Sequence, residues 1–167
     1  MYINNKVGNV IYKVIEYFGD DVRRINHFLK VYGYVKMIGE CENLDDSMQE
    51  ILEVTAVLHD VGIKVAEQKY NSSAGHYQQL EGPPVAKKIL DELGYPDDFV
   101  ERVMYLIAHH HTYTNIDGMD YQILVEADFL VNADEDRLSS DAIENFKEKI
   151  FKTTTGIAVL ENNYLNL

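Results

Sequence analysis

The sequence predicts an all-α protein, a compact bundle of about six to eight helices. Three observations lead to this prediction. Apolar residues recur at helical spacing along most of the chain, no stretch shows a convincing strand-like alternation, and only three prolines interrupt the 167 residues. There is no repeat and no linker rich in serine or glycine. We therefore expect residues 1–167 to form a single domain, large enough to bury a core without disulfides.

The first two predicted helices cover the N-terminal quarter of the chain. Residues 4–18 place apolar side chains on one face and end near Gly19. A second helix is predicted over about 20–39, with apolar residues around its whole axis. His27 lies on one of its apolar faces, at helical spacing from valine, tyrosine and isoleucine. A helix that is apolar on all sides is expected to lie at the centre of the fold.

A third helix is predicted to start near Asp45 and to end at Gly62, which we expect to adopt the left-handed conformation of a C-cap. His59 and Asp60 would then occupy its last turn. Residues 63–81 are polar and contain glycine and serine, which predicts a loop beside this pair.

The remaining helices are predicted from proline, glycine and acidic residues at their ends. Pro83 and Pro84 suit the start of a helix, and Gly94 suits its end. Three later helices are predicted over about 97–109, 120–132 and 139–151. A short helix is predicted after them, at the C-terminus.

Composition excludes several classes of partner. Fifteen basic against 28 acidic residues give a formal net charge of −13, which disfavours extended nucleic acid. No apolar run approaches the roughly 18 residues of a membrane span, and the N-terminus lacks the pattern of a signal peptide. The single Cys41 has no partner for a disulfide or a zinc finger. We expect a soluble cytoplasmic protein without a membrane partner. The sequence is compatible with a monomer and with a homodimer.

Ligand-type side chains interrupt four of the predicted apolar segments. They are His27, the His59-Asp60 pair, Asp128 and a run of three histidines at 109–111. A single histidine on an apolar face is more often a hydrogen-bonded core residue than a metal ligand, and a single aspartate at a helix end is more often a cap. Because four helices each contribute such a group, however, one cation could neutralise them all.

The types of residue narrow the metal. Neutral imidazoles with carboxylates and no thiolate favour Mn, Fe, Co, Ni or Zn. The set formed by His27, His59, Asp60 and Asp128 leaves open positions on a six-coordinate ion, as a catalytic site requires. One or two such ions are the expected cofactors.

On these residues the chain resembles the HD-domain superfamily of metal-dependent phosphohydrolases. His27, the pair HD at 59–60 and Asp128 match the superfamily's H…HD…D pattern, over about residues 20–135. The resemblance implies a metal-activated water that attacks a phosphate ester. It also implies that Asp60 binds the metal, or bridges two metals, and can accept the proton of the water. Lys64 is the candidate clamp for the phosphate, with an exposed lysine after a helix as the alternative.

The resemblance also implies a second metal in some members, held by a further histidine and by a His-His element. His110 and His111 match that element in the segment AHHH. The segment QLEGPPVAKKIL resembles the part with the further histidine, but it contains glutamine and glutamate instead. We expect Glu81 to replace that histidine as a metal ligand. The alternative is that Glu81 is an acidic residue in the first turn of a helix, where it matches the helix dipole. His76 is another candidate ligand.

The expected substrate is a small phosphorylated molecule such as a nucleotide. Two other functions stay open on the same scaffold: a di-iron oxygenase, and a non-catalytic regulatory domain that binds metal. Oxygen consumption by an iron-loaded protein would distinguish the first from a hydrolase. Tight metal retention without turnover would indicate the second.

Overall fold

The computed structural model describes residues 6–166, and this part of the chain is helical throughout with no strand. The prediction of an all-α fold is confirmed. The predicted helix over 4–18 begins at Lys6 here, and its first two residues lie outside the described part. The elements are α1 (Lys6–Phe18), α2 (Val22–Cys41), α3 (Asp46–Leu58), α4 (Gly62–Tyr70), α5 (Gly75–Glu92), α6 (Asp97–His109), α7 (Met119–Glu135), α8 (Ser140–Ile150), α9 (Thr154–Leu160) and a π-helical turn, η1 (Glu161–Leu165).

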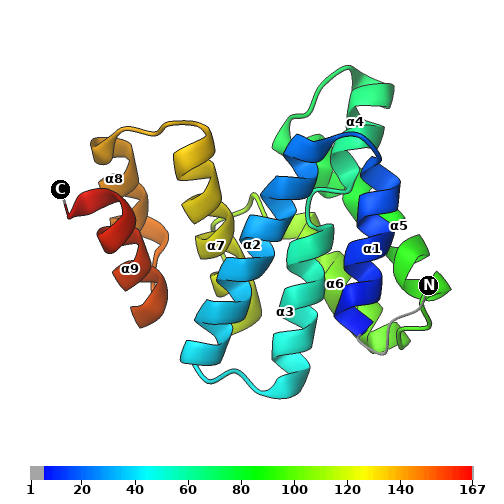
Figure 1. The fold of residues 1–167 in the computed structure, drawn as a ribbon, viewed down its shortest axis with the longest axis horizontal. Coiled ribbons are helices and arrows are strands. Elements are labelled where there is room, and N and C mark those ends of the chain that lie inside the picture. Colours follow the sequence, from blue (N-terminus) through cyan, green and yellow to red (C-terminus); the bar gives the residue numbers. More distant parts are fainter. Residues whose placement is uncertain (1–5, 167) are drawn as a thin grey trace.

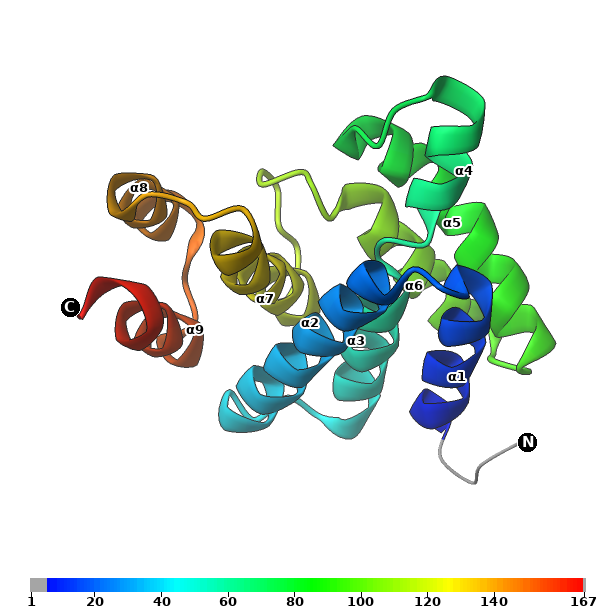
Figure 2. The same cartoon turned by 45° about the horizontal axis from the view of Figure 1, so that its top comes forward.

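Helices α2 and α3 form a hairpin in the middle of the fold (Figures 1 and 2). The hairpin packs against α1 and α6 on one side and against α7 on the other. Its loop begins just after Cys41, and α3 starts at Asp46, where the Asp45 carboxylate accepts a hydrogen bond from the Met48 amide. The two helices run in opposite directions, and His27 lies 14 residues before the end of α2 at Cys41 (41 − 27 = 14), so α3, with its 13 residues, returns to the level of His27.

The hairpin contributes to two separate apolar clusters. One joins α1 and the start of α2 to α3, α5 and α6, and includes Phe28, Leu58 and Val103. The other joins the end of α2 and part of α3 to α7, α8 and α9, and includes Ile38 and Leu124. The polar side chains predicted from the sequence lie where these two clusters meet.

The region after α3 differs from the prediction. Residues 62–70 form α4, and α5 already starts at Gly75, so the predicted loop over 63–81 is mostly helical. Gly62 does not adopt a left-handed conformation, whereas Gly19 and Gly94 do. A Cβ atom on Gly62 would lie 2.6 Å from the Gln78 carbonyl oxygen and from the Gly82 amide nitrogen. Gly62 is therefore required by the close crossing of α4 and α5, and not by a helix cap.

Pro83 and Pro84 lie inside α5 and do not start it. Tertiary packing overrides their local preference, because α5 packs along both α4 and α6.

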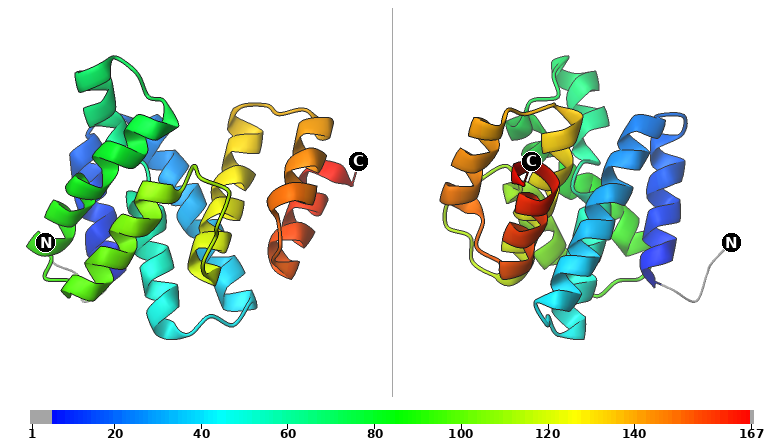
Figure 3. Two further views of the ribbon diagram at one scale, coloured as in Figure 1. Left: turned by 180° about the vertical axis from the view of Figure 1, so that it is seen from behind. Right: turned by 60° about the vertical axis from the view of Figure 1, so that its left-hand side comes forward.

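The C-terminal helices α8 and α9 form the far end of the molecule, next to α7 (Figure 3). The fully buried Glu126 of α7 holds the segment before α9. Its carboxylate accepts hydrogen bonds from the Lys152 amide (2.8 Å), the Thr153 amide (3.0 Å), the Thr153 hydroxyl and the Gln122 side chain (2.7 Å). Within residues 6–166, no helix is both long and apolar enough to cross a bilayer.

Candidate metal centre

Five of the predicted ligand residues come together at one end of the central hairpin. His27 lies on α2, His59 follows the last residue of α3, and Asp60 lies in the tight turn before α4. His110 follows α6, and Asp128 lies in the middle of α7. Four helices and one turn therefore supply these side chains, as the sequence pattern indicated.

Four ligand atoms form a compact group. The Nε2 atom of His27 lies 3.3 Å from His59 Nε2, 3.3 Å from Asp60 Oδ2 and 3.2 Å from Asp128 Oδ1. His59 Nε2 lies 3.5 Å from the same Asp60 atom and 3.4 Å from the same Asp128 atom. Ligands bound at about 2.0–2.2 Å lie about 2.8–3.6 Å apart, over the range from octahedral to tetrahedral angles. The spacing of these atoms therefore suits a single cation.

The second nitrogen of each imidazole has a hydrogen-bond acceptor. His27 Nδ1 lies 2.9 Å from a Glu135 carboxylate oxygen, and His59 Nδ1 lies 2.7 Å from the Ala56 carbonyl oxygen. His110 Nδ1 lies 2.7 Å from the Ile107 carbonyl oxygen. When Nδ1 carries the proton, Nε2 presents a lone pair, and such an outer partner is a regular feature of histidines that bind metals. All three Nε2 atoms are thereby prepared to bind a cation.

Two atoms of the cluster are buried without a hydrogen bond: Asp128 Oδ1 and His110 Nε2. Asp128 Oδ1 lies within 3.4 Å of two imidazole nitrogens, and when both imidazoles are neutral with the proton on Nδ1, their lone pairs face this oxygen and form no hydrogen bond with it. A buried acceptor without a donor costs about 1–3 kcal/mol. A divalent cation in the four-atom group would satisfy Asp128 Oδ1, and one between Asp60 and His110 would satisfy His110 Nε2, so the residues present fit a metal.

Comparison with known proteins agrees with this geometry. The family model of the HD domain matches residues 24–144, which is most of the chain. The chain belongs to the HD-domain family. The crystal structure of a predicted HD superfamily hydrolase from an uncultured Thermotogales bacterium has a similar fold, with a TM-score of 0.63 and 23% identity, covering 94% of this chain and 82% of that one. A search of curated proteins found no match.

This HD domain has a second group of ligand-type residues next to the first. Asp60, His110 and His111 each offer a ligand atom, all within 4.8 Å of one another, so Asp60 belongs to both groups. Burial, together with the neighbouring His110, lowers the pKa of His111 to about 4, which keeps its imidazole neutral at pH 7. His109 is not in the group; its ring lies against Tyr105.

Gln78 occupies the place next to His111. Its buried side chain accepts a hydrogen bond from His111 Nε2 (3.0 Å) and donates one to the Ser73 carbonyl oxygen (2.6 Å). Gln78 is not among the residues predicted from the sequence, because an amide in the segment HYQQLE carries no metal signal of its own. Its position after the pair His59-Asp60, in the segment that resembles the family's histidine region, is the signal that could have found it.

The structure does not bring Glu81 to the metal centre. The Glu81 carboxylate accepts hydrogen bonds from Lys69 (2.9 Å) and from the Tyr70 hydroxyl (2.7 Å). It lines a different cavity, between α1, α4 and α5. In place of a metal, a lysine neutralises this carboxylate, so we do not retain Glu81 in the ligand set. His76 is exposed and lies against Tyr77.

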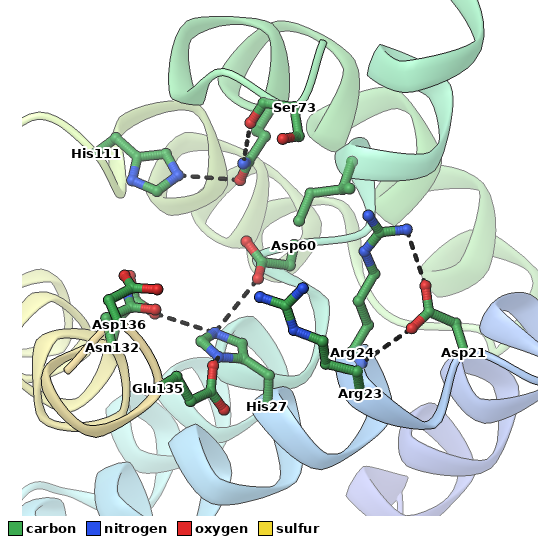
Figure 4. Close-up of a pocket in the computed structure, with 13 residues that line it drawn as sticks. Asp21, Arg23, Arg24, His27, Asp60, Ser73, His111, Asn132, Glu135 and Asp136 are labelled. Carbon is green, nitrogen blue, oxygen red and sulfur yellow. Dashed lines mark hydrogen bonds and ion pairs between the residues drawn. The ribbon is translucent and has the colours of Figure 1, made fainter. Parts of the chain in front are cut away.

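Lys64 also lies away from the centre. Its ammonium group donates a hydrogen bond to the Tyr17 carbonyl oxygen (2.9 Å) and lies 5.1 Å from the centroid of the Tyr17 ring. Among the described residues, the cavity above the cluster is lined instead by two arginines, Arg23 and Arg24, and by polar residues of α7 (Figure 4). This cavity has a volume of about 400 Å³.

We expect the metal-free protein to lose stability as the pH rises from about 6.5 to about 9. Burial alone lowers the pKa of His59, but the carboxylates of Asp60 and Asp128 outweigh it and raise the pKa from 6.5 to about 9. The bound proton therefore stabilises the folded state fully below pH 6.5, and this contribution, on the order of 3 kcal/mol, disappears as the pH passes 9. Urea unfolding in the presence of a chelator would measure it.

The variant His59→Gln is the control, because it has no imidazole to protonate at this position. Its metal-free form should lose less stability over the same pH range. Equal pH dependence in the two metal-free proteins would contradict the prediction.

Proposed function

We propose that this HD domain is a metal-dependent phosphohydrolase that acts on a small phosphate ester, with a nucleotide as the first candidate. The observation that carries the proposal is the convergence of three imidazole Nε2 atoms with the carboxylates of Asp60 and Asp128 below an open cavity. The ligand set keeps positions free for water and substrate. The similar crystal structure is that of a predicted HD superfamily hydrolase, which supports the proposal.

A divalent ion held here would supply a water of lowered pKa and a Lewis acid for the phosphoryl oxygen. His27, His59 and Asp128 fix the geometry, since the outer hydrogen bonds hold both imidazoles in one tautomer. Asp60 is the least buried of these ligands, with 16% of its side chain exposed, and it faces the cavity. In the proposed reaction Asp60 accepts the proton of the attacking water. The water oxygen forms a new P–O bond as the P–O ester bond breaks, and the proton passes on to the leaving oxygen, so the products are inorganic phosphate and an alcohol.

A phosphate-release assay tests the proposal. Protein freed of metal would be reloaded with Mn, Co, Ni, Fe or Zn and incubated with mononucleotides, nucleoside polyphosphates and sugar phosphates. We expect metal-dependent phosphate release from at least one of them, and elemental analysis would give one or two ions per chain. Oxygen consumption by the iron-loaded protein, without phosphate release, would favour an oxygenase instead. Metal retention without either activity would indicate a regulatory domain.

A further inference from the structure

Two neighbouring arginines in the first turns of α2 lie at the cavity, but only one of them has a partner. The Arg24 guanidinium donates to Asp21 (2.9 Å) and forms an ion pair with Glu67. Within residues 6–166, the exposed Arg23 side chain forms no hydrogen bond, ion pair or ring contact. Figure 4 shows its guanidinium turned toward the side of the cavity where His27 and Asp60 lie, whereas the Arg24 guanidinium is turned toward Asp21.

The charges around Arg23 limit what the cavity can bind. Five carboxylates and two guanidiniums line it, a formal net charge of −3. A single divalent ion would reduce this to −1. The Arg24 charge is already matched by acids, so one ion and Arg23 are the free positive charges available to an anion. Asp136 and Glu135 on the α7 side would repel further negative charge.

The size of the cavity also favours a small ligand with little negative charge. Sites for small molecules occupy roughly 300–1,000 Å³, and the volume here, about 400 Å³, is at the lower end of that range. A small ester with one phosphate is therefore a better match than a long polyphosphate.

We infer that Arg23 binds the phosphate group of the substrate, and that the site takes molecules with a single phosphate group. The inference deepens the proposed function and rests on it. Arg23 replaces Lys64 in the role of phosphate clamp, because Lys64 is held at Tyr17 outside the cavity. A guanidinium can donate two parallel hydrogen bonds to two phosphate oxygens, and a lysine cannot reproduce this geometry.

The alternative is that Arg23 is an ordinary solvated arginine on a helix, without a ligand. Calorimetric binding of inorganic phosphate to the metal-loaded protein separates the two readings, because phosphate is the product of every phosphomonoester. We expect Arg23→Ala to weaken phosphate binding by about tenfold or more, the effect of losing one charge-assisted interaction. Arg23→Lys should recover part of it. Elemental analysis should show the same metal content in all variants.

Lys88→Ala is the matched control, since it removes one positive charge from an exposed position on α5, outside this cavity. Its phosphate affinity should equal that of the wild type. With adenosine mono-, di- and triphosphate as substrates, Arg23→Ala should raise KM for the monophosphate more than it lowers kcat, and the wild type should prefer the monophosphate.

Three results would overturn the inference: unchanged phosphate affinity in Arg23→Ala at normal metal content, a larger loss in Lys64→Ala than in Arg23→Ala, or a preference of the wild type for the triphosphate. Failure of the proposed function looks different. In that case the wild type binds metal and phosphate, Arg23→Ala weakens the phosphate binding, and no phosphate ester is hydrolysed.

Discussion

Asp60→Ala is expected to abolish metal retention and, with it, phosphohydrolase turnover, a larger loss than the factor of about a hundred to ten thousand for a positioned proton acceptor alone. Asp60 is the one residue of the described chain that both ligand groups share. Its Oδ2 atom faces His27 and His59, and its Oδ1 atom lies 3.7 Å from His110 Nε2. Its removal therefore affects every metal position at once.

Elemental analysis and a phosphate-release assay would measure both effects. Asp60→Asn is a useful second variant, because it keeps the shape of the side chain and removes the charge. Asp141→Asn makes the same chemical change at an exposed position on α8 and should leave metal content and turnover unchanged. Normal metal content together with normal turnover in Asp60→Ala would refute the ligand assignment.

Glu126→Ala is expected to destabilise the fold by about 3–5 kcal/mol, because hydrogen-bond donors left without an acceptor cost about 1–3 kcal/mol each. The Glu126 side chain is fully buried, and the backbone amides of Lys152 and Thr153 would be left without an acceptor. Because Glu126 holds the segment before α9, the loss should be largest in the C-terminal helices.

Urea unfolding would measure the change in stability, and hydrogen exchange would locate it. Glu148→Ala removes an exposed glutamate from α8 and should change the free energy of unfolding by less than about 0.5 kcal/mol. Glu126 and Asp128 lie on different faces of α7, since one contacts the segment before α9 and the other faces the metal centre. Folded Glu126→Ala should therefore keep its metal. A loss below about 1 kcal/mol would show that the network contributes little.

The sequence was sufficient to predict which ligand residues on regular helices face the interior. His27 and Asp128 interrupt apolar faces whose helical period is clear, and the tight hairpin of α2 and α3 brings His59 back to the level of His27. The approach of His59 to His27 follows from the local helices and from one short connection. The approach of Asp128 depends on the long-range packing of α7, and it was predicted from the resemblance to the HD pattern.

The wrong predictions concern residues whose conformation or side-chain direction depends on packing against segments distant in the sequence. Local signals at Gly62 and Pro83 indicate a cap and a helix start, but the crossing of α4 and α5 overrides both. Lys64 and Glu81 have suitable chemistry, yet Tyr17 and Lys69 bind them elsewhere.

Besides Gln78, three residues at the site were missed: Arg23, Arg24 and Glu135. Arg23 and Arg24 are adjacent and chemically identical, so that only the positions of Asp21 and Glu67 reveal which of them is free. Glu135 could have been found, because it follows Asp128 by seven residues and so lies on the same face of α7.

The position of the ligands between the two apolar clusters has a consequence for how the protein unfolds. His110 follows α6, which belongs to the cluster around Phe28, whereas Asp128 lies on α7, which belongs to the cluster around Leu124. A cation bound by both sides acts as a cross-link between the two clusters, in addition to the α2–α3 hairpin, which belongs to both. Its binding energy then becomes part of the cooperativity of folding.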